Sequence, residues 1–231
     1  MASTKAPIII SLGGSLIVPK TGIDIAFLSE FKKIILRRVA EGDRFILICG
    51  GGSVARQYQE AAGALGKLSR HSLDWVGIHA TRLNAHLVRS MFLDESFPRV
   101  VTDPKGGAKF KESIMLAAGW KPGCSTDFDA VLQAVQHGVK EMYNLSNTDY
   151  VYDKDPNKFP DAKPYKDMDW KSLRKIVGNA WDPGLHVPFD PVASKRAEKI
   201  GLEVRIVNGK NLKNFEAALM GKTFVGTIIH P

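Results

Sequence analysis

Short apolar runs that end in glycine, separated by helical patterns, constrain the fold of this chain most strongly. Residues 7–12 read PIIISL and lead into Gly13 and Gly14, and residues 43–49 read DRFILIC and lead into three more glycines. Such short, continuously apolar runs are typical of strands buried on both faces of a parallel sheet. Residues 23–42, between the two runs, carry apolar side chains at helical spacing. The pattern predicts a strand–helix–strand unit.

The rest of the chain continues this alternation. We expect further strands over residues 99–103, 113–119, 139–147, 202–209 and 224–231, and helices over residues 53–65, 72–94, 125–139, 169–178, 188–201 and 212–221. Alternating strands and helices predict an α/β fold with a mainly parallel sheet and helices on both faces, and ligands then bind at the carboxyl ends of the strands. No linker divides the chain, so we expect one domain over residues 1–231, with the proline-rich stretch 155–165 as an excursion from the sheet.

The composition is ordinary for a globular protein. The chain has 231 residues, of which 44% are hydrophobic and 24% charged, with two cysteines and a net charge of +8. We find no secretory signal, no apolar run long enough for a membrane helix and no metal-binding cysteine pattern, and we expect a cytoplasmic protein. The basic residues form no arm or nucleic-acid signature. The positive charge therefore favours an anionic small-molecule ligand and no nucleic-acid partner.

Two glycine loops follow the first two strands. Gly13 and Gly14 end the first strand, and residues 50–52 are all glycine at a helix start, with Arg56 one turn into that helix. Glycine lets backbone amides approach a phosphate closely, and a helix N-terminus adds a favourable dipole. Neither loop fits the Walker or dinucleotide patterns. Each alone also fits a tight strand-to-helix turn; two in succession favour phosphate binding.

Two later stretches carry polar groups at strand ends. Residues 119–127 read GWKPGCSTD, where Ser125 or Thr126 can cap a helix or help to bind a second phosphate. Residues 144–156 read NLSNTDYVYDKDP and combine acids, amides and two tyrosine rings after a strand. An adenine ring requires a flat or apolar wall, and its ribose and amino group require acceptors. The second stretch could supply both.

Taken together, these stretches resemble the amino acid kinase superfamily, and most closely its UMP kinases of the archaeal type. The resemblance rests on the two glycine loops, on Asp-x-x-Gly-Ile at residues 74–78, on Pro-Gly-x-Ser-Thr-Asp at residues 122–127, and on Asn-x-Asp-x-Val-Tyr-x-x-Asp-Pro at residues 147–156. Residues 189–201, FDPVASKRAEKIG, are similar to UMP kinases in particular. The resemblance covers nearly the whole chain.

The resemblance implies a fold and an activity. The implied fold is a three-layer α/β/α sandwich around a mainly parallel eight-stranded sheet, with the phosphate acceptor over the N-terminal half and ATP over the C-terminal half. The implied reaction is a Mg²⁺-dependent transfer of the γ-phosphoryl group of ATP to UMP by a cytoplasmic homohexamer. Phosphoryl transfer fits the residues, because it depends mainly on positioning and charge neutralisation and needs no nucleophilic triad.

The resemblance also assigns roles to individual residues. The catalytic group would comprise Gly13 and Gly14 around the transferred phosphoryl group and Asp127, which would orient phosphate donors or Mg²⁺. The remaining ATP contacts would be Ser11, Gly52, Arg56, Ser146, Asn147, Tyr152 and Asp155. The UMP contacts would be Gly51, Asp74, Trp120, Lys121, Gly123, Cys124, Ser125 and Thr126, with Asp74 accepting hydrogen bonds from the ribose. The residues of a metal site remain open.

Two residues, Ser11 and Trp120, depart from what the superfamily commonly carries. Many relatives have a lysine where this chain has Ser11, and that lysine would stabilise transition-state charge. UMP kinases of the archaeal type often lack it, so Ser11 agrees with that branch, although it also leaves room for slow turnover. Trp120 stands among positions where small residues are expected, and either narrows the acceptor pocket or packs under the loop. Lys121 either compensates for the missing lysine or is a solvated loop residue.

Two other functions stay open. The chain could be a superfamily kinase for a different small acceptor, although Cys49, where isopentenyl phosphate kinases carry a histidine, argues against that substrate. The acceptor loop also resembles those of acetylglutamate, glutamate and aspartate kinases less well. The chain could instead be a non-catalytic nucleotide-binding storage protein, since molybdate-storage subunits share the fold. UMP-dependent turnover of ATP would separate these possibilities.

Overall fold

A computed structural model describes residues 5–182 and 187–231. Its main sheet has seven strands in the order β3-β2-β1-β4-β8-β9-β7. These are β1 (Ile8–Leu12), β2 (Phe45–Cys49), β3 (Ile114–Ala117), β4 (Glu141–Ser146), β7 (Asp167–Asp169), β8 (Glu203–Asn208) and β9 (Gly226–His230). All neighbouring pairs are parallel except β8 with β9. The mainly parallel α/β sheet is therefore confirmed.

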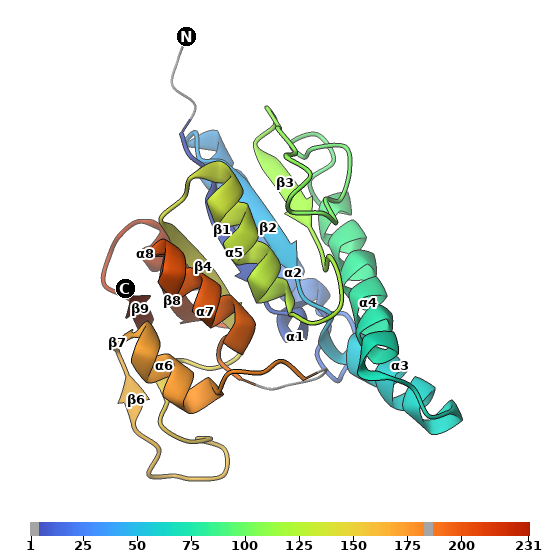
Figure 1. Cartoon of the computed structure of the whole chain (residues 1–231). Helices are drawn as coiled ribbons and strands as arrows, with labels where there is room; N and C mark the ends of the chain where they lie inside the picture. The colour runs from blue at the N-terminus through green and yellow to red at the C-terminus, as the bar shows by residue number, and fades with distance from the viewer. Residues whose placement is uncertain (1–4, 183–186) are drawn as a thin grey trace.

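Helices cover both faces of this sheet (Figure 1). They are α1 (Gly14–Ile17), α2 (Ile25–Ala40), α3 (Gly52–Leu65), α4 (Arg70–Ser90), α5 (Thr126–His137), α6 (Trp170–Val177), α7 (Pro191–Ile200) and α8 (Leu212–Leu219). Helices α5, α6 and α7 lie over the face turned to the viewer, and α2 and α8 lie behind the sheet. The expected three-layer α/β/α arrangement is present.

The alternation of side chains along the strands builds two separate apolar cores. In β2, Phe45, Leu47 and Cys49 pack with α2, α4 and α8, whereas Ile46 and Ile48 pack with α5, α6 and α7. Successive side chains of a strand point to opposite faces, so a fully apolar strand serves both layers. This is why the short apolar runs identify the central strands.

The sheet has one strand fewer than the eight that we expected. The stretch 99–103, predicted as a strand, pairs with β3 only through an isolated bridge between Val101 and Ala117, and a second bridge joins Ser96 to Ile114. Between the bridges the edge segment advances five positions, from Ser96 to Val101, while β3 advances three, from Ile114 to Ala117, so the register is not continuous. The edge segment therefore touches β3 at two points without forming a strand.

The excursion predicted at residues 155–165 lies outside the main sheet. It connects β5 (Val151–Tyr152) to β6 (Pro164–Tyr165), which form a two-stranded antiparallel sheet. Residues 155–159 form a turn in which the Asp155 carbonyl accepts the Phe159 amide at 3.0 Å. Among the described residues, no helix is long and apolar enough to cross a membrane.

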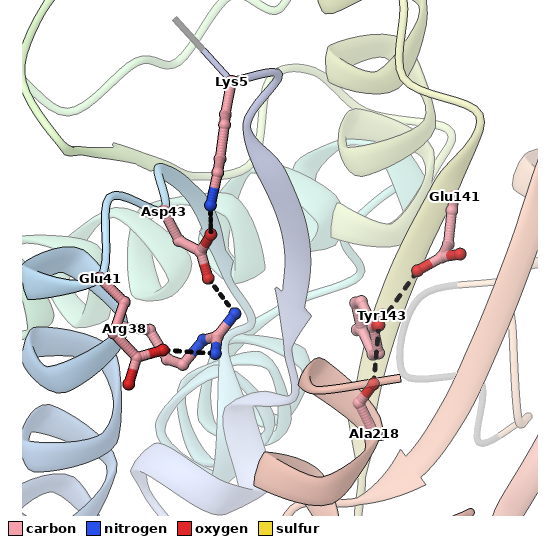
Figure 2. A network of polar contacts seen from close by, with 7 residues as sticks. All are labelled: Lys5, Arg38, Glu41, Asp43, Glu141, Tyr143 and Ala218. Carbon is pink, nitrogen blue, oxygen red and sulfur yellow. Dashed lines mark hydrogen bonds and ion pairs between the residues drawn. The ribbon is translucent and has the colours of Figure 1, made fainter. Parts of the chain in front are cut away.

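Polar contacts tie the elements together at the amino ends of the strands (Figure 2). Just before β2, Asp43 pairs with Lys5, which precedes β1, and with Arg38 of α2. The Tyr143 hydroxyl of β4 lies 3.1 Å from the Ala218 carbonyl of α8. These contacts stabilise the amino ends of the strands. The glycine loops lie at the opposite, carboxyl ends.

Candidate functional site at the carboxyl edge of the sheet

The two glycine loops contact each other directly. The Gly13 amide donates to the Leu145 carbonyl of β4 at 3.0 Å, and the Gly50 amide donates to the Leu12 carbonyl of β1 at 3.0 Å. A Cβ atom on Gly14 would lie 2.1 Å from the Gly52 nitrogen, a distance that no side chain can occupy. The close approach therefore requires glycine and brings both predicted phosphate loops to one point.

The second loop presents the start of α3 at this point. Gly52 has a φ of +64°, which favours glycine, and Gly51 is the N-cap without a side-chain acceptor. The Ser53 amide donates to the Val18 carbonyl at 2.9 Å, and this hydrogen bond links α3 to the end of α1. Arg56 is half-buried one turn into α3. A helix start without an acidic cap attracts anions.

Asp127 stands beside the glycine loops and is oriented by three donors. The Ser11 hydroxyl and the Asn144 amide donate to its Oδ1 at 2.8 and 2.9 Å, and the Asp190 backbone amide donates to its Oδ2 at 3.2 Å. Burial and the nearby Asp190 carboxylate raise the pKa of Asp127 to about 7, although the donors act in the opposite direction. The site thus holds one fixed carboxyl group where β1 and β4 end.

Three carboxylates hold the loop that precedes α5. Asp129 Oδ2 accepts the Trp120 amide at 3.1 Å, Asp74 Oδ2 accepts the Gly123 amide at 2.8 Å, and Asp190 Oδ2 accepts the Ser125 amide at 2.6 Å. These carboxylates come from α5, from α4 and from the N-cap of α7, and all three residues are buried. The predicted acceptor loop is therefore anchored from three helices.

Within this loop, Ser125 is the N-cap of α5, as the sequence predicted. Its hydroxyl accepts the Asp127 amide at 3.1 Å, and Thr126 is the first residue of the helix. Cys124 is half-buried, with its Sγ 3.6 Å from the Lys121 carbonyl. The loop thus places Ser125 and Thr126 next to Asp127.

Two ammonium groups lie close to the Trp120 ring. Lys121 Nζ is 4.3 Å from the ring centroid, and Lys105 Nζ is 5.2 Å from it. Arg82 donates to the Gly119 and Trp120 carbonyls at 3.2 Å each. Cations stacked on an indole are attracted by its π face. Lys121 is therefore engaged with Trp120, and Lys105 and Arg82 add positive charge to a loop that three acidic residues anchor.

The residues predicted to surround adenosine follow β4. The Ser146 hydroxyl lies 3.1 Å from the Thr148 carbonyl, and Asn147 is exposed. Tyr152 is half-buried and meets Tyr150 edge-on, with the ring centroids 6.2 Å apart. Asp155 Oδ1 accepts both the backbone amide and the side-chain amide of Asn157, which stabilises the turn. Ser146 and Tyr152 stand near the carboxyl edge of the sheet, whereas the Asp155 carboxylate stabilises the turn that follows β5.

Four residues of this edge were not predicted as site residues. They are Asp129, Asn144, Trp181 and Asp190. Asn144 could have been found as a polar residue inside an apolar strand, and Asp190 as a cap signature before Pro191 at a helix start. Asp129 follows Asp127 on an amphipathic helix, and no local signal distinguishes it from a solvated acid.

Comparison with known proteins agrees with this geometry. Residues 6–208 match the model of the amino acid kinase family. The chain is 32% identical over 225 residues to the uridylate kinase of Methanospirillum hungatei, covering 96% of this chain and 94% of that protein, and 34% identical over 190 residues to that of Staphylothermus marinus. The crystal structure of uridylate kinase from Archaeoglobus fulgidus superposes with a TM-score of 0.81 and 30% identity, covering 96% of this chain and 99% of that one. The chain belongs to the amino acid kinase family.

Proposed function

We propose that this protein is a UMP kinase, which transfers the γ-phosphoryl group of ATP to UMP and releases UDP and ADP. The observation that carries the proposal is the contact between Gly14 and Gly52, which joins two glycine loops next to Asp127. A phosphoryl group held beside this contact would lie next to both glycine loops. Full-length similarity to uridylate kinases supports UMP as the acceptor.

We assign the acceptor to the N-terminal half of a single domain. Gly51, the Asp74 carboxylate and the loop of residues 120–126 would surround UMP. Because three carboxylates anchor that loop through its backbone amides, its conformation is set before the substrate arrives. Lys121, held over the Trp120 ring, would keep positive charge near the UMP phosphate.

ATP belongs to the C-terminal half in this proposal. The Gly14 amide would hold the transferred phosphoryl group, and Gly13 would shape the turn, because its own amide donates to the Leu145 carbonyl. Gly52 and Arg56 would contact the other phosphates. Ser146, Asn147 and Tyr152 would line the nucleoside, whereas Asp155 would act through the turn that it stabilises. Catalysis would then depend on the alignment of two phosphates and on the neutralisation of their charge.

We propose that ATP is used as its Mg²⁺ complex. Across residues 5–182 and 187–231, no three His, Cys, Asp or Glu side chains stand together as a metal site. A Mg²⁺ ion bound mainly by phosphates and water needs only one or two protein carboxylates. Asp127 Oδ2 accepts one hydrogen bond and retains a lone pair for such a complex. The ion would neutralise phosphate charge.

A cytoplasmic homo-oligomer, with a hexamer as the expected size, is part of the same proposal. The α3–α4 hairpin projects from the body of the molecule (Figure 1) and exposes apolar side chains such as Tyr58, Leu65 and Leu68. Exposed apolar surface of this kind is typical of an interface between proteins. Light scattering during gel filtration measures the number of subunits.

A coupled ADP-release assay tests the proposed reaction. Mg·ATP is supplied with UMP, CMP, dUMP, acetylglutamate, aspartate or isopentenyl phosphate in separate reactions. We expect strong ADP release with UMP. Release with another acceptor instead would make the protein a kinase for that molecule. ATP binding without release for any acceptor would favour a storage protein.

A further inference from the structure

Trp181 contacts the carboxylate that we assign to the ribose of UMP. Its indole Nε1–H donates to Asp74, with the nitrogen 3.2 Å from Oδ1 and 3.4 Å from Oδ2. The next residue, Asp182, pairs with Arg70 at the start of α4, with Oδ1 and Nε 3.2 Å apart. Two consecutive residues therefore meet the first turns of α4.

This contact joins the two halves of the molecule. Trp181 follows α6 of the C-terminal half, and 107 positions separate it from Asp74 on α4. In Figure 1 the chain after α6 runs from that helix toward the lower end of α1, beside the start of α3. The segment that carries Trp181 thus reaches Asp74 on α4, where we place the acceptor.

The contact leaves Asp74 little capacity for another ligand. Asp74 is only 7% exposed, and its Oδ2 already accepts the Gly123 amide at 2.8 Å. The indole N–H is shared between both carboxylate oxygens. A carboxylate offers about four lone-pair sites, and the amide and the shared indole N–H occupy three of them, so two ribose hydroxyls can both donate to Asp74 only after the indole has left.

We propose that Trp181 and the ribose hydroxyls of the acceptor compete for the Asp74 carboxylate, so that the indole must leave before UMP binds fully. The inference rests on the proposed function, because it takes UMP as the ligand of Asp74. The Gly123 amide keeps its bond to Asp74 in both arrangements, so the acceptor loop stays anchored. Trp181 is thus a positioning residue that sets the apparent affinity for the acceptor.

The size of the effect follows from the competition. A ligand that binds only when the indole has moved has an apparent dissociation constant increased by the inverse of the fraction of molecules in that arrangement. A hydrogen bond to a charged group, weakened here by its shared geometry and partial exposure, biases this equilibrium by roughly threefold to tenfold. Removal of the indole N–H should lower the dissociation constant of UMP by that factor.

Calorimetry of UMP and ATP binding, each nucleotide alone, tests the inference on three proteins: wild type, Trp181→Phe and Trp75→Phe. Trp75 is the matched control, because it follows Asp74 on α4 and packs against His71 and His79. We expect Trp181→Phe to bind UMP roughly threefold to tenfold more tightly, and Trp75→Phe to remain within about twofold of wild type. ATP binding should be unchanged in both variants.

Equal or weaker UMP binding by Trp181→Phe would overturn the inference and make Trp181 a wall of the pocket or a purely structural residue. Tighter binding of both nucleotides would also overturn it, since the competition concerns the acceptor alone. Thermal melting verifies that the variant folds, and Trp181→Leu replaces it if it does not. Failure of the proposed function is distinguished by wild-type turnover, because no protein would then release ADP with UMP.

Discussion

The Ser11 hydroxyl donates to Asp127 Oδ1 at 2.8 Å, where many members of the superfamily carry a lysine in place of this serine. Asn144 donates to the same oxygen at 2.9 Å, so uncharged donors orient the carboxyl group. A hydroxyl group positions its neighbour but adds no positive charge to a transition state. The positive charge for phosphoryl transfer must come from other groups, and Arg56 and Mg²⁺ are the groups that we assign.

Substitution of Asp127 tests its assignment to the reaction. We expect Asp127→Asn to lower kcat by roughly 10²-fold or more, because an amide presents a second donor to the groups that donate to Asp127. Ser11→Ala is the matched control and should cost less than about tenfold, since Asn144 still orients the carboxylate. Steady-state kinetics with UMP and Mg·ATP measure both. Near-normal turnover by Asp127→Asn would show that the Asp127 carboxyl group takes no part in the reaction.

Asp129 makes stability depend on pH. Burial, with the Asp127 and Asp190 carboxylates, raises the pKa of Asp129 from 3.8 to about 8, although the Trp120 amide and Arg82 lower it. Between these pH values the folded protein retains a proton that the unfolded chain releases, so this contribution to the free energy of unfolding falls by up to about 1.4 kcal/mol per pH unit as the pH rises.

The Asp129→Asn variant isolates this contribution. Its side chain stays neutral, so urea unfolding between pH 4 and pH 8 should show a shallower loss of stability than wild type. Because Asp127 still titrates in both proteins, the difference between the two curves reports Asp129. Parallel curves would show that Asp129 is ionised in the folded protein throughout this range.

The contact between the glycine loops can be tested by a single methyl group. In Gly14→Ala the new Cβ would overlap the Gly52 nitrogen at 2.1 Å, and both partners are backbone. We expect a loss of about 3 kcal/mol or more in the free energy of unfolding, or failure to fold. Gly63→Ala, where a Cβ on α3 meets no atom within 4 Å, should stabilise the protein by about 0.4–1 kcal/mol. Similar stability of the two variants would refute the contact.

Substitution of Asp74 should raise the KM for the acceptor far more than the KM for ATP. Replacement by alanine removes the proposed ribose partner and releases the Gly123 amide, which loosens the acceptor loop. We expect the KM for UMP to rise at least about tenfold while the KM for ATP stays within about twofold. Comparable changes in both constants would place Asp74 outside the acceptor site.

Much of the fold could be predicted because its signals are local. Strands such as β2, apolar on both faces, and the Ser125 cap of α5 are set by neighbouring residues. The eighth strand is missing because the register changes between the two bridges that join the edge segment to β3. The β-strand propensity of residues 99–103 favoured a strand, but the segment makes only isolated bridges with β3 and so forms none.

The site was only partly accessible from the sequence because its partners are distant in the chain. The glycine loops are recognisable by composition, but their mutual contact arises only when β1 and β2 lie side by side. Asp190 reaches Asp127 across 63 positions, and no periodicity reports such a pairing. Asp74 was predicted from the resemblance as a ribose ligand. Its hydrogen bonds to Gly123 and Trp181 join residues far apart in the chain, so only the three-dimensional structure reveals them.

Identification of the phosphorylated product tests directly whether the protein transfers the γ-phosphoryl group of ATP to UMP. Wild-type protein is incubated with Mg·ATP and UMP, and the nucleotides are separated and quantified, with Asp127→Asn as the matched control. We expect UDP and ADP in equal amounts from wild type and roughly 10²-fold less of both from the variant. ADP without UDP, or UDP formed equally well by the variant, would contradict phosphoryl transfer to UMP at this site.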